Sequence, residues 1–218
     1  MGTKAFLIDT SKCIGCRACQ VACKQWNELP AEKTVNRGTY QNPLDLSSVT
    51  WTLIRFKEVS SNDTLKWHFF KDQCRHCLEP PCQLSSSVPG SIIQDKTGAV
   101  IYTDKTKYED FDEILCPYNI PRQDKNTMRL FKCTMCVDRV KNSLLPACVK
   151  ACPTGTMQFA DRDEMLEKGK KRVEELKSIY KNASLMDDVE DISVFYILID
   201  EPEMYEMSRR LDVKSMFA

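Results

Sequence analysis

The sequence contains no long hydrophobic run. Its longest apolar stretch, at residues 194–199, has six residues, whereas a transmembrane helix needs roughly 20. Residues 1–10 also lack the basic segment and apolar core that make up an export signal. We therefore expect neither a transmembrane segment nor an export signal in this chain.

The sequence has no excess charge of either sign, because its 31 acidic and 31 basic residues cancel. Proteins that bind nucleic acids usually carry a basic patch that neutralises phosphates, so no nucleic-acid partner is expected. Hydrolytic triads, glycine-rich phosphate loops and haem-attaching CxxCH motifs are absent as well. We therefore expect no catalytic residues in the chain.

Cysteine, by contrast, is abundant, with 12 residues in a chain of 218. Cys13, Cys16, Cys19 and Cys23 have the spacing C-x2-C-x2-C-x3-C, which is the bacterial ferredoxin pattern for a 4Fe–4S cluster. Two-residue gaps let a loop curl so that three thiolates meet three irons of one cube. The fourth cysteine ligates the other cluster in two-cluster ferredoxins, so the motif predicts a partner motif elsewhere.

The partner motif lies near residue 140, where two cysteine pairs are followed by Pro153. Its first spacing (C-x2-C) and its last spacing (C-x3-C) equal those of the first motif, but more residues separate its second and third cysteines. If the last cysteine of each motif ligates the cluster of the other motif, cluster A is expected on Cys13, Cys16, Cys19 and Cys152. Cluster B is expected on Cys23, Cys133, Cys136 and Cys148.

The remaining four cysteines lie between the two motifs, and we assign cluster C to Cys74, Cys77, Cys82 and Cys116. When the ferredoxin template is laid on this region, the four ligands of a further cluster are missing. Those positions hold Ser86, Thr106, Glu109 and Asp112. The sequence therefore predicts an inserted ferredoxin-like unit with one site deleted, and three 4Fe–4S clusters in all.

Two other interpretations of the cysteines stay open. A disulfide framework suits a small exported protein, but no signal peptide is visible and the density of CxxC pairs suits metals better. Structural zinc also uses CxxC pairs. The run from Cys13 to Cys23 does not divide naturally into the two pairs that a tetrahedral zinc ion takes.

Short apolar runs and alternating aromatic-rich segments predict the strands. Residues 5–8 and 158–160 read as short strands beside the first and second cysteine motifs. A hairpin is expected from residues 51–56 and 65–70, and a second from residues 92–102. We expect these two hairpins to flank cluster C on both sides.

The other segments are less regular. Residues 28–48 have no periodicity and predict an irregular surface segment that makes contacts. Residues 161–180 have an apolar stripe and early acidic residues, which predict a helix. A strand is expected at residues 192–199, and the tail from residue 201 is expected to pack on a neighbour or to be disordered.

Together these features predict an α+β protein of two interlocked ferredoxin-like domains, the second inserted in the first, with a carboxy-terminal helix-strand extension. The first domain would comprise residues 1–48 and 126–160, the inserted domain residues 49–125, and the extension residues 161–218. His76 and Trp26 are interpreted as packing residues rather than as a cluster ligand and an electron relay.

Four segments carry a family likeness: residues 13–27 (CIGCRACQVACKQWN), 74–82 (CRHCLEPPC), 116–118 (CPY) and 132–157 (which contain KCTMCVDRV and LLPACVKACPTGTM). With them, nearly the whole chain resembles the iron-sulfur beta subunit of molybdenum- or tungsten-dependent formate dehydrogenases. Membrane-bound members of that family resemble this chain but carry four clusters and an anchor helix. The closer likeness is to the soluble two-subunit enzymes.

The resemblance implies a large partner subunit that holds the metal, the molybdopterin and the formate site. The chain itself would then be a non-catalytic electron-transfer subunit that passes electrons to an acceptor such as a cytochrome. It also implies a periplasmic location reached by co-export with the catalytic subunit, with the cytoplasm as the alternative. Two alternatives remain: a subunit of a thiosulfate, polysulfide or sulfoxide reductase, and a free-standing multi-cluster ferredoxin.

Overall fold

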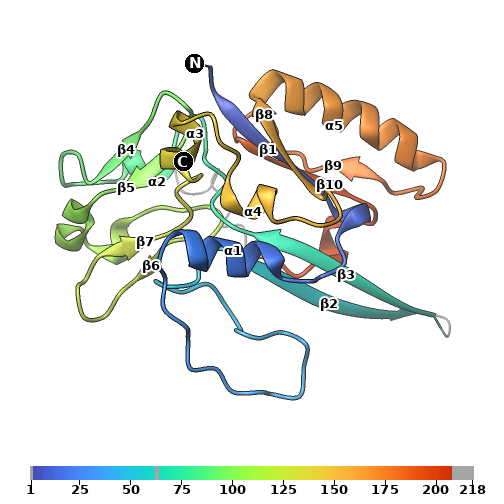
Figure 1. Ribbon diagram of the computed structural model, residues 1–218, viewed down its shortest axis with the longest axis horizontal. Coiled ribbons are helices and arrows are strands. Elements are labelled where there is room, and N and C mark those ends of the chain that lie inside the picture. The colour runs from blue at the N-terminus through green and yellow to red at the C-terminus, as the bar shows by residue number, and fades with distance from the viewer. Residues whose placement is uncertain (1, 62–63, 208–218) are drawn as a thin grey trace.

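The computed structural model of the chain describes residues 2–61 and 64–207, and a four-stranded sheet lies at its centre (Figure 1). In this sheet β1 (Lys4–Asp9) pairs antiparallel with β8 (Met157–Asp161) and parallel with β10 (Val194–Leu198). β10 pairs in turn with β9 (Ser184–Leu185). The three strands predicted at residues 5–8, 158–160 and 192–199 are confirmed. The segment expected as an extension thus supplies strands to the central sheet.

The two faces of this sheet pack against different parts of the molecule. Successive residues of a strand point to opposite faces, and in β1 the side chains of Ala5 and Leu7 pack with the long helix α5 (Arg162–Lys177). Phe6 and Ile8 point the other way and pack with cysteine-bearing segments. Figure 1 shows α5 along one side of the sheet. The cysteine-bearing segments form a second layer, the cysteine-rich layer, which contributes residues to both packed clusters.

Helix α5 confirms the helix predicted over residues 161–180, although it ends at Lys177. Met165, Val173 and Leu176 are buried on its inner face. A Cβ at Gly169 would lie 3.1 Å from a methyl group of Leu7. Glycine at this position therefore lets the helix approach the sheet closely.

Both predicted hairpins are confirmed. β2 (Leu53–Ser61) pairs with β3 (Thr64–Asp72) along nine residue pairs, and the strands are longer than predicted. β4 (Ile92–Gln94) pairs with β5 (Val100–Tyr102), and the turn is closed by a hydrogen bond from Gly98 N to Asp95 O (2.8 Å).

Short elements connect these parts and carry or flank the cysteines. The helices are α1 (Ala18–Trp26), α2 (Pro81–Leu84), α3 (Val137–Lys141) and α4 (Ala147–Lys150). The 3-10 turns are η1 (Thr10–Lys12), η2 (Asp104–Tyr108), η3 (Phe111–Glu113) and η4 (Pro202–Met204). A further two-stranded sheet consists of β6 (Arg122–Gln123) and β7 (Leu130–Phe131). Within the described ranges, no helix has the length and apolar character needed to cross a membrane.

The segment over residues 28–48 contains no helix or strand, as predicted. It contacts the first cysteine motif of its own chain, because the Tyr40 hydroxyl donates to the carbonyl oxygen of Gly15 (2.8 Å). The Arg17 guanidinium also lies over the Tyr40 ring, 4.3 Å from its centroid.

The tail follows the expectation only in part. Tyr205 is buried against its own chain, and its hydroxyl accepts a hydrogen bond from Ile199 N (3.0 Å). The expectation of disorder is therefore wrong for residues 201–207, because an aromatic side chain anchors them to the sheet. Packing on a neighbour stays a prediction. Residues 208–218 lie outside the described part of the chain.

Candidate iron-sulfur cluster sites

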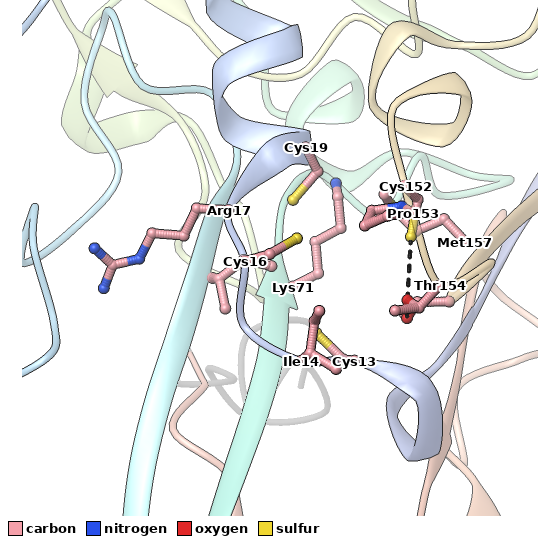
Figure 2. A pocket seen from close by; sticks show the side chains of 12 residues that line it. Cys13, Ile14, Cys16, Arg17, Cys19, Lys71, Cys152, Pro153, Thr154 and Met157 are labelled. Atoms are coloured by element: carbon pink, nitrogen blue, oxygen red, sulfur yellow. Dashed lines mark hydrogen bonds between the residues drawn. The ribbon is translucent and has the colours of Figure 1, made fainter.

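Three cavities lie in the cysteine-rich layer, and each is lined by four cysteines. Site A is lined by Cys13, Cys16, Cys19 and Cys152, and contains about 340 Å³ of space free of protein atoms (Figure 2). In Figure 2 the cysteines surround one common space, while the Arg17 side chain points away from it. Three of these cysteines come from the loop before α1 and from the start of that helix, and Cys152 follows α4.

The loop that carries Cys13 and Cys16 depends on glycine. Gly15 has a φ of +66°, and a Cβ at this position would lie 2.4 Å from the Phe69 ring. Arg17 also has a left-handed φ of 61°. These two left-handed residues curl the backbone so that both thiols line the same cavity.

Site B is lined by Cys23, Cys133, Cys136 and Cys148, around about 300 Å³ of empty space. Helix α1 reaches both sites, since Cys19 lines site A and Cys23, one turn later, lines site B. The Cys133 thiol accepts a hydrogen bond from Met135 N (3.4 Å), and Met135 has a left-handed φ of 61°. Backbone amides directed at sulfur stabilise negative charge on it.

Site C is lined by Cys74, Cys77, Cys82 and Cys116, around about 310 Å³ of empty space. Its first loop repeats the geometry of site B, because His76 N donates to the Cys74 thiol (3.4 Å) from a left-handed φ of 48°. The four-thiol linings of the three cavities fit the same kind of group, a cube held by four cysteines.

The hairpins are placed differently from the prediction. Val100 and Tyr102 of β5 line site C, but residues of the long hairpin do not. Instead, Ile54 of β2 and Lys71 of β3 line site A. The expectation that both hairpins flank cluster C is therefore wrong, because the inner face of β2 and β3 packs against the first cysteine motif.

Site B adjoins both other sites, because Cys148 belongs to one packed cluster with Cys19 of site A, and Cys133 belongs to another with Cys74 of site C. Burial raises the pKa of the Cys19 thiol to about 12, and the thiolate of Cys148 in site B adds to this effect. Burial likewise raises the pKa of the Cys133 thiol to about 12, with contributions from Cys148 and from Cys74 in site C. Site B therefore has a close neighbour on each side.

Most of these thiols are difficult to ionise without a cation, because they are buried among one another. Burial raises the pKa of Cys116 to about 12 and that of Cys136 to about 11. For Cys152, burial would raise the pKa, but hydrogen bonds from Met157 N and the Thr154 hydroxyl outweigh it and lower the pKa. Metal binding to such a set releases protons and contributes to folding.

The thiols are not arranged for a single ion. Among residues 2–61 and 64–207, no three His, Cys, Asp or Glu side chains converge closely enough to hold one metal ion. All twelve cysteines are free of disulfides in the structure. The arrangement around cavities therefore fits a cube better than structural zinc or a disulfide framework.

The structure brings together two of the four positions at which the sequence lacks ligands for a further cluster. The Glu109 carboxylate accepts hydrogen bonds from the hydroxyls of Ser86 (2.5 Å) and Ser87 (3.0 Å). Thr106 is fully buried, and its hydroxyl donates to Thr103 O (2.8 Å). The structure thus brings Ser86 and Glu109 together, whereas Asp112 is exposed.

Two buried lysines beside the sites were missed by the sequence analysis. Lys71 lines site A and Lys132 lines site C, and their exposed fractions are 2% and 5%. Burial alone would lower the pKa of Lys71, but the thiolates of Cys148 and Cys19 raise it above its usual range. The only signal in the sequence is the closeness of each lysine to a CxxC pair.

His76 has the packing role expected of it, whereas Trp26 lies at the surface. His76 is fully buried, does not line site C, and accepts a hydrogen bond from Val100 N at its Nδ1 atom (3.1 Å). Trp26 is 42% exposed and donates from Nε1 to a carboxylate oxygen of Asp138 (2.8 Å).

Comparison with protein families matches two models. Residues 4–25 match the 4Fe–4S binding domain, and residues 65–162 match the 4Fe–4S dicluster domain. These ranges contain every cysteine of the chain.

Individual relatives share most of their length with this chain. The formate dehydrogenase 2 subunit beta (cytochrome c-553) of Nitratidesulfovibrio vulgaris is 49% identical over 93% of this chain and 96% of the relative. The formate dehydrogenase subunit beta of Megalodesulfovibrio gigas is 42% identical over 93% and 97%. The iron-sulfur subunit of the nitrate-inducible formate dehydrogenase of Escherichia coli is 44% identical over 92% and 70%. The chain therefore belongs to the iron-sulfur, or beta, subunits of formate dehydrogenases, which are electron-transfer proteins with ferredoxin-like 4Fe–4S domains.

Proposed function

We propose that the chain carries three 4Fe–4S clusters, which relay electrons between a molybdopterin catalytic subunit that acts on formate and an external acceptor. The observation that carries the proposal is the set of three cavities, each lined by four cysteines, with site B adjoining the other two. Neighbouring clusters pass single electrons from one to the next. The molybdenum or tungsten, the pterin and the formate site belong to the partner in this proposal.

Each cluster takes the four cysteines that line one cavity. Cluster A takes Cys13, Cys16, Cys19 and Cys152. Cluster B takes Cys23, Cys133, Cys136 and Cys148. Cluster C takes Cys74, Cys77, Cys82 and Cys116.

The proposed arrangement of domains follows from these ligand sets. Sites A and B draw ligands from both ends of the first 152 residues, whereas the ligands of site C lie between them. This supports an inserted ferredoxin-like domain at residues 49–125 within a first domain of residues 1–48 and 126–160. The extension proposed at residues 161–218 contributes β9 and β10 to the central sheet.

The partners are proposed from the relatives. Their names identify them as subunits of formate dehydrogenases, and one name includes cytochrome c-553. We propose a heterodimer with the catalytic subunit, a cytochrome or similar carrier as acceptor, and a periplasmic location reached by co-export. Cell fractionation after co-expression with the catalytic subunit tests the location: recovery of both subunits in the cytoplasm would contradict it.

The number of clusters is tested by anaerobic analysis of the purified chain. Three cubes contain about twelve iron atoms and as many inorganic sulfides. We expect that ratio per chain in the holoprotein. A value near eight would remove one of the proposed sites, and a value near sixteen would contradict the deletion of the fourth.

The division of labour is tested with formate and a redox dye. The isolated, iron-loaded chain should be reduced and reoxidised by dyes but should not oxidise formate, because it holds no pterin. Addition of the catalytic subunit should allow formate to reduce the dye and the clusters. Robust formate turnover by the isolated chain would overturn the proposal, and so would clusters that formate cannot reduce in the complex.

A further inference from the structure

Two lysines are buried beside the cysteine-lined sites. Lys71 lies at the end of β3 and lines site A, and Lys132 directly precedes Cys133 and lines site C. Lysine is almost never fully buried unless its charge is paired. The position of both ammonium groups inside the cysteine-rich layer therefore needs a physical reason.

The Lys71 ammonium lies between sites A and B, because Lys71 lines site A and its two acceptors, Thr52 and Gln73, line site B. It donates to the Thr52 hydroxyl (2.8 Å) and to the side-chain oxygen of Gln73. Both acceptors are neutral. In Figure 2 the Lys71 side chain runs along the cavity of site A and ends beside Cys19.

The Lys132 ammonium has a similar environment at site C. It donates to the carbonyl oxygens of Val100 (2.5 Å) and Cys133 (3.1 Å), and it lies 4.6 Å from the centroid of the Tyr102 ring. It also acts electrostatically on Cys82, a residue of site C. Its partners, like those of Lys71, include no carboxylate.

The ion pairs formed within the described residues include neither lysine. Arg75, which also lines site C, differs because its guanidinium lies 3.3 Å from the buried Asp72 carboxylate. A buried cation without a carboxylate is retained only where another negative charge compensates it. The thiolates of the cluster sites are the negative groups that meet this need.

We propose that Lys71 and Lys132 tune the reduction potentials of the clusters, Lys71 at clusters A and B and Lys132 at cluster C. This inference rests on the proposed function, because it concerns clusters held by the three cysteine sets. Reduction adds one electron, and hence one negative charge, to a cluster without making or breaking a covalent bond. A fixed ammonium in a low-dielectric interior favours the more negative state and so raises the potential.

The test is a potentiometric titration of the holoprotein, followed by paramagnetic resonance under anaerobic conditions. Lys71→Met should shift the midpoints of clusters A and B to more negative values and leave cluster C unchanged. Lys132→Met should shift cluster C and leave cluster A unchanged. We expect at least a tenfold change in each one-electron equilibrium constant, which corresponds to about 59 mV.

Three further variants separate charge from packing. Lys170→Met removes an exposed lysine from α5 and should shift no cluster. Lys71→Gln keeps a polar group near Thr52 and should shift A and B even if the methionine variant does not assemble. Lys71→Arg keeps the charge and should return both potentials close to those of the unmodified protein.

Two results would overturn the proposal. One is a set of neutral variants with full iron content and unchanged potentials. The other is an arginine variant shifted as far as the neutral ones, which would assign the effect to packing. Iron and sulfide analysis of the unmodified chain comes first, so that an absence of clusters is recognised as a failure of the proposed function.

Discussion

Glu109 has a buried carboxylate surrounded by hydrogen-bond donors. Besides the hydroxyls of Ser86 and Ser87, it accepts from Ser91 Oγ and from the backbone amides of Ser87 (3.1 Å) and Val88 (3.2 Å). Burial would raise the pKa of this carboxyl, but the hydrogen bonds, that from Ser86 first, lower it to about 2. At the position of a missing cluster ligand, Glu109 therefore holds the surrounding loop together.

Glu109→Gln should lower the free energy of unfolding by about 1–3 kcal/mol, because it replaces charged hydrogen bonds with neutral ones. A depressed pKa means that the stabilisation is complete above the pKa of the unfolded state, near 4.5, and is lost only as the pH falls toward 2. The difference between variant and unmodified protein should therefore stay constant from about pH 6 to pH 8. Anaerobic urea titrations followed by circular dichroism measure it.

The matched control for this variant is Glu113→Gln, which removes an exposed carboxylate from the neighbouring turn η3. It should change the stability by less than about 0.5 kcal/mol. A Glu109 variant as stable as this control would show that the hydrogen-bonded carboxylate contributes nothing.

At the same scale, cysteine spacing allowed the three linings to be predicted, because each set is built from short loops of defined reach. The left-handed conformation of the residue before Cys77 or before Cys136 was not predictable, since histidine and methionine rarely adopt it. Lys71 was also missed. A lysine in a strand is usually solvated, and only the tertiary structure buries this one.

Helix α1 connects two cluster sites within nine residues. Cys19 and Cys23 are four residues apart and therefore lie on the same side of the helix, yet they line different cavities. A single helix therefore supplies cysteines of the first motif to both site A and site B.

Cys23→Ala should damage cluster B and spare cluster A, although Cys23 belongs to the motif that supplies most of site A. Cys19→Ala is the matched control on the same helix, and it should damage cluster A instead. Paramagnetic resonance and iron analysis of both variants measure the losses. Loss of A with retention of B in the Cys23 variant would mean that the crossed ligand assignment is wrong.

Elements were predicted well where the signal is local. Short apolar runs indicated β1 and β8, alternation and turn residues indicated the hairpins, and the apolar stripe indicated α5. The position of β10 beside β1 was not predictable from alternation, because parallel pairing across most of the chain leaves no local signal. The same limit explains why the long hairpin was expected at site C.

At the scale of the whole molecule, Tyr196 joins parts that are distant in sequence. It is fully buried in β10, and its hydroxyl donates to the carbonyl oxygen of Lys71 in β3 (2.7 Å) and accepts from Arg75 beside site C (2.8 Å). Its ring also stacks on Phe70, with 4.5 Å between centroids. One side chain therefore connects the central sheet, the long hairpin and the loop of site C.

Tyr196→Phe should lower the free energy of unfolding by about 1–3 kcal/mol, because it leaves a buried carbonyl and a buried guanidinium each without one partner. Denaturant titration of the holoprotein, with circular dichroism and cluster absorbance as two probes, measures the loss. Tyr108→Phe is the control, since Tyr108 is 68% exposed. Equal stabilities of the two variants would argue against a connecting role for Tyr196.

The parallel pairing of Phe6 with Val194 also has a consequence for biosynthesis. At a translation rate of roughly 5–20 residues per second, about 10–40 s separate the synthesis of these two partners. The last cysteine, Cys152, is made before β10. A nascent chain on the ribosome therefore holds all three sets of thiols before β10 has been synthesised to pair with β1. Clusters inserted at that stage would bind to a chain whose central sheet is incomplete.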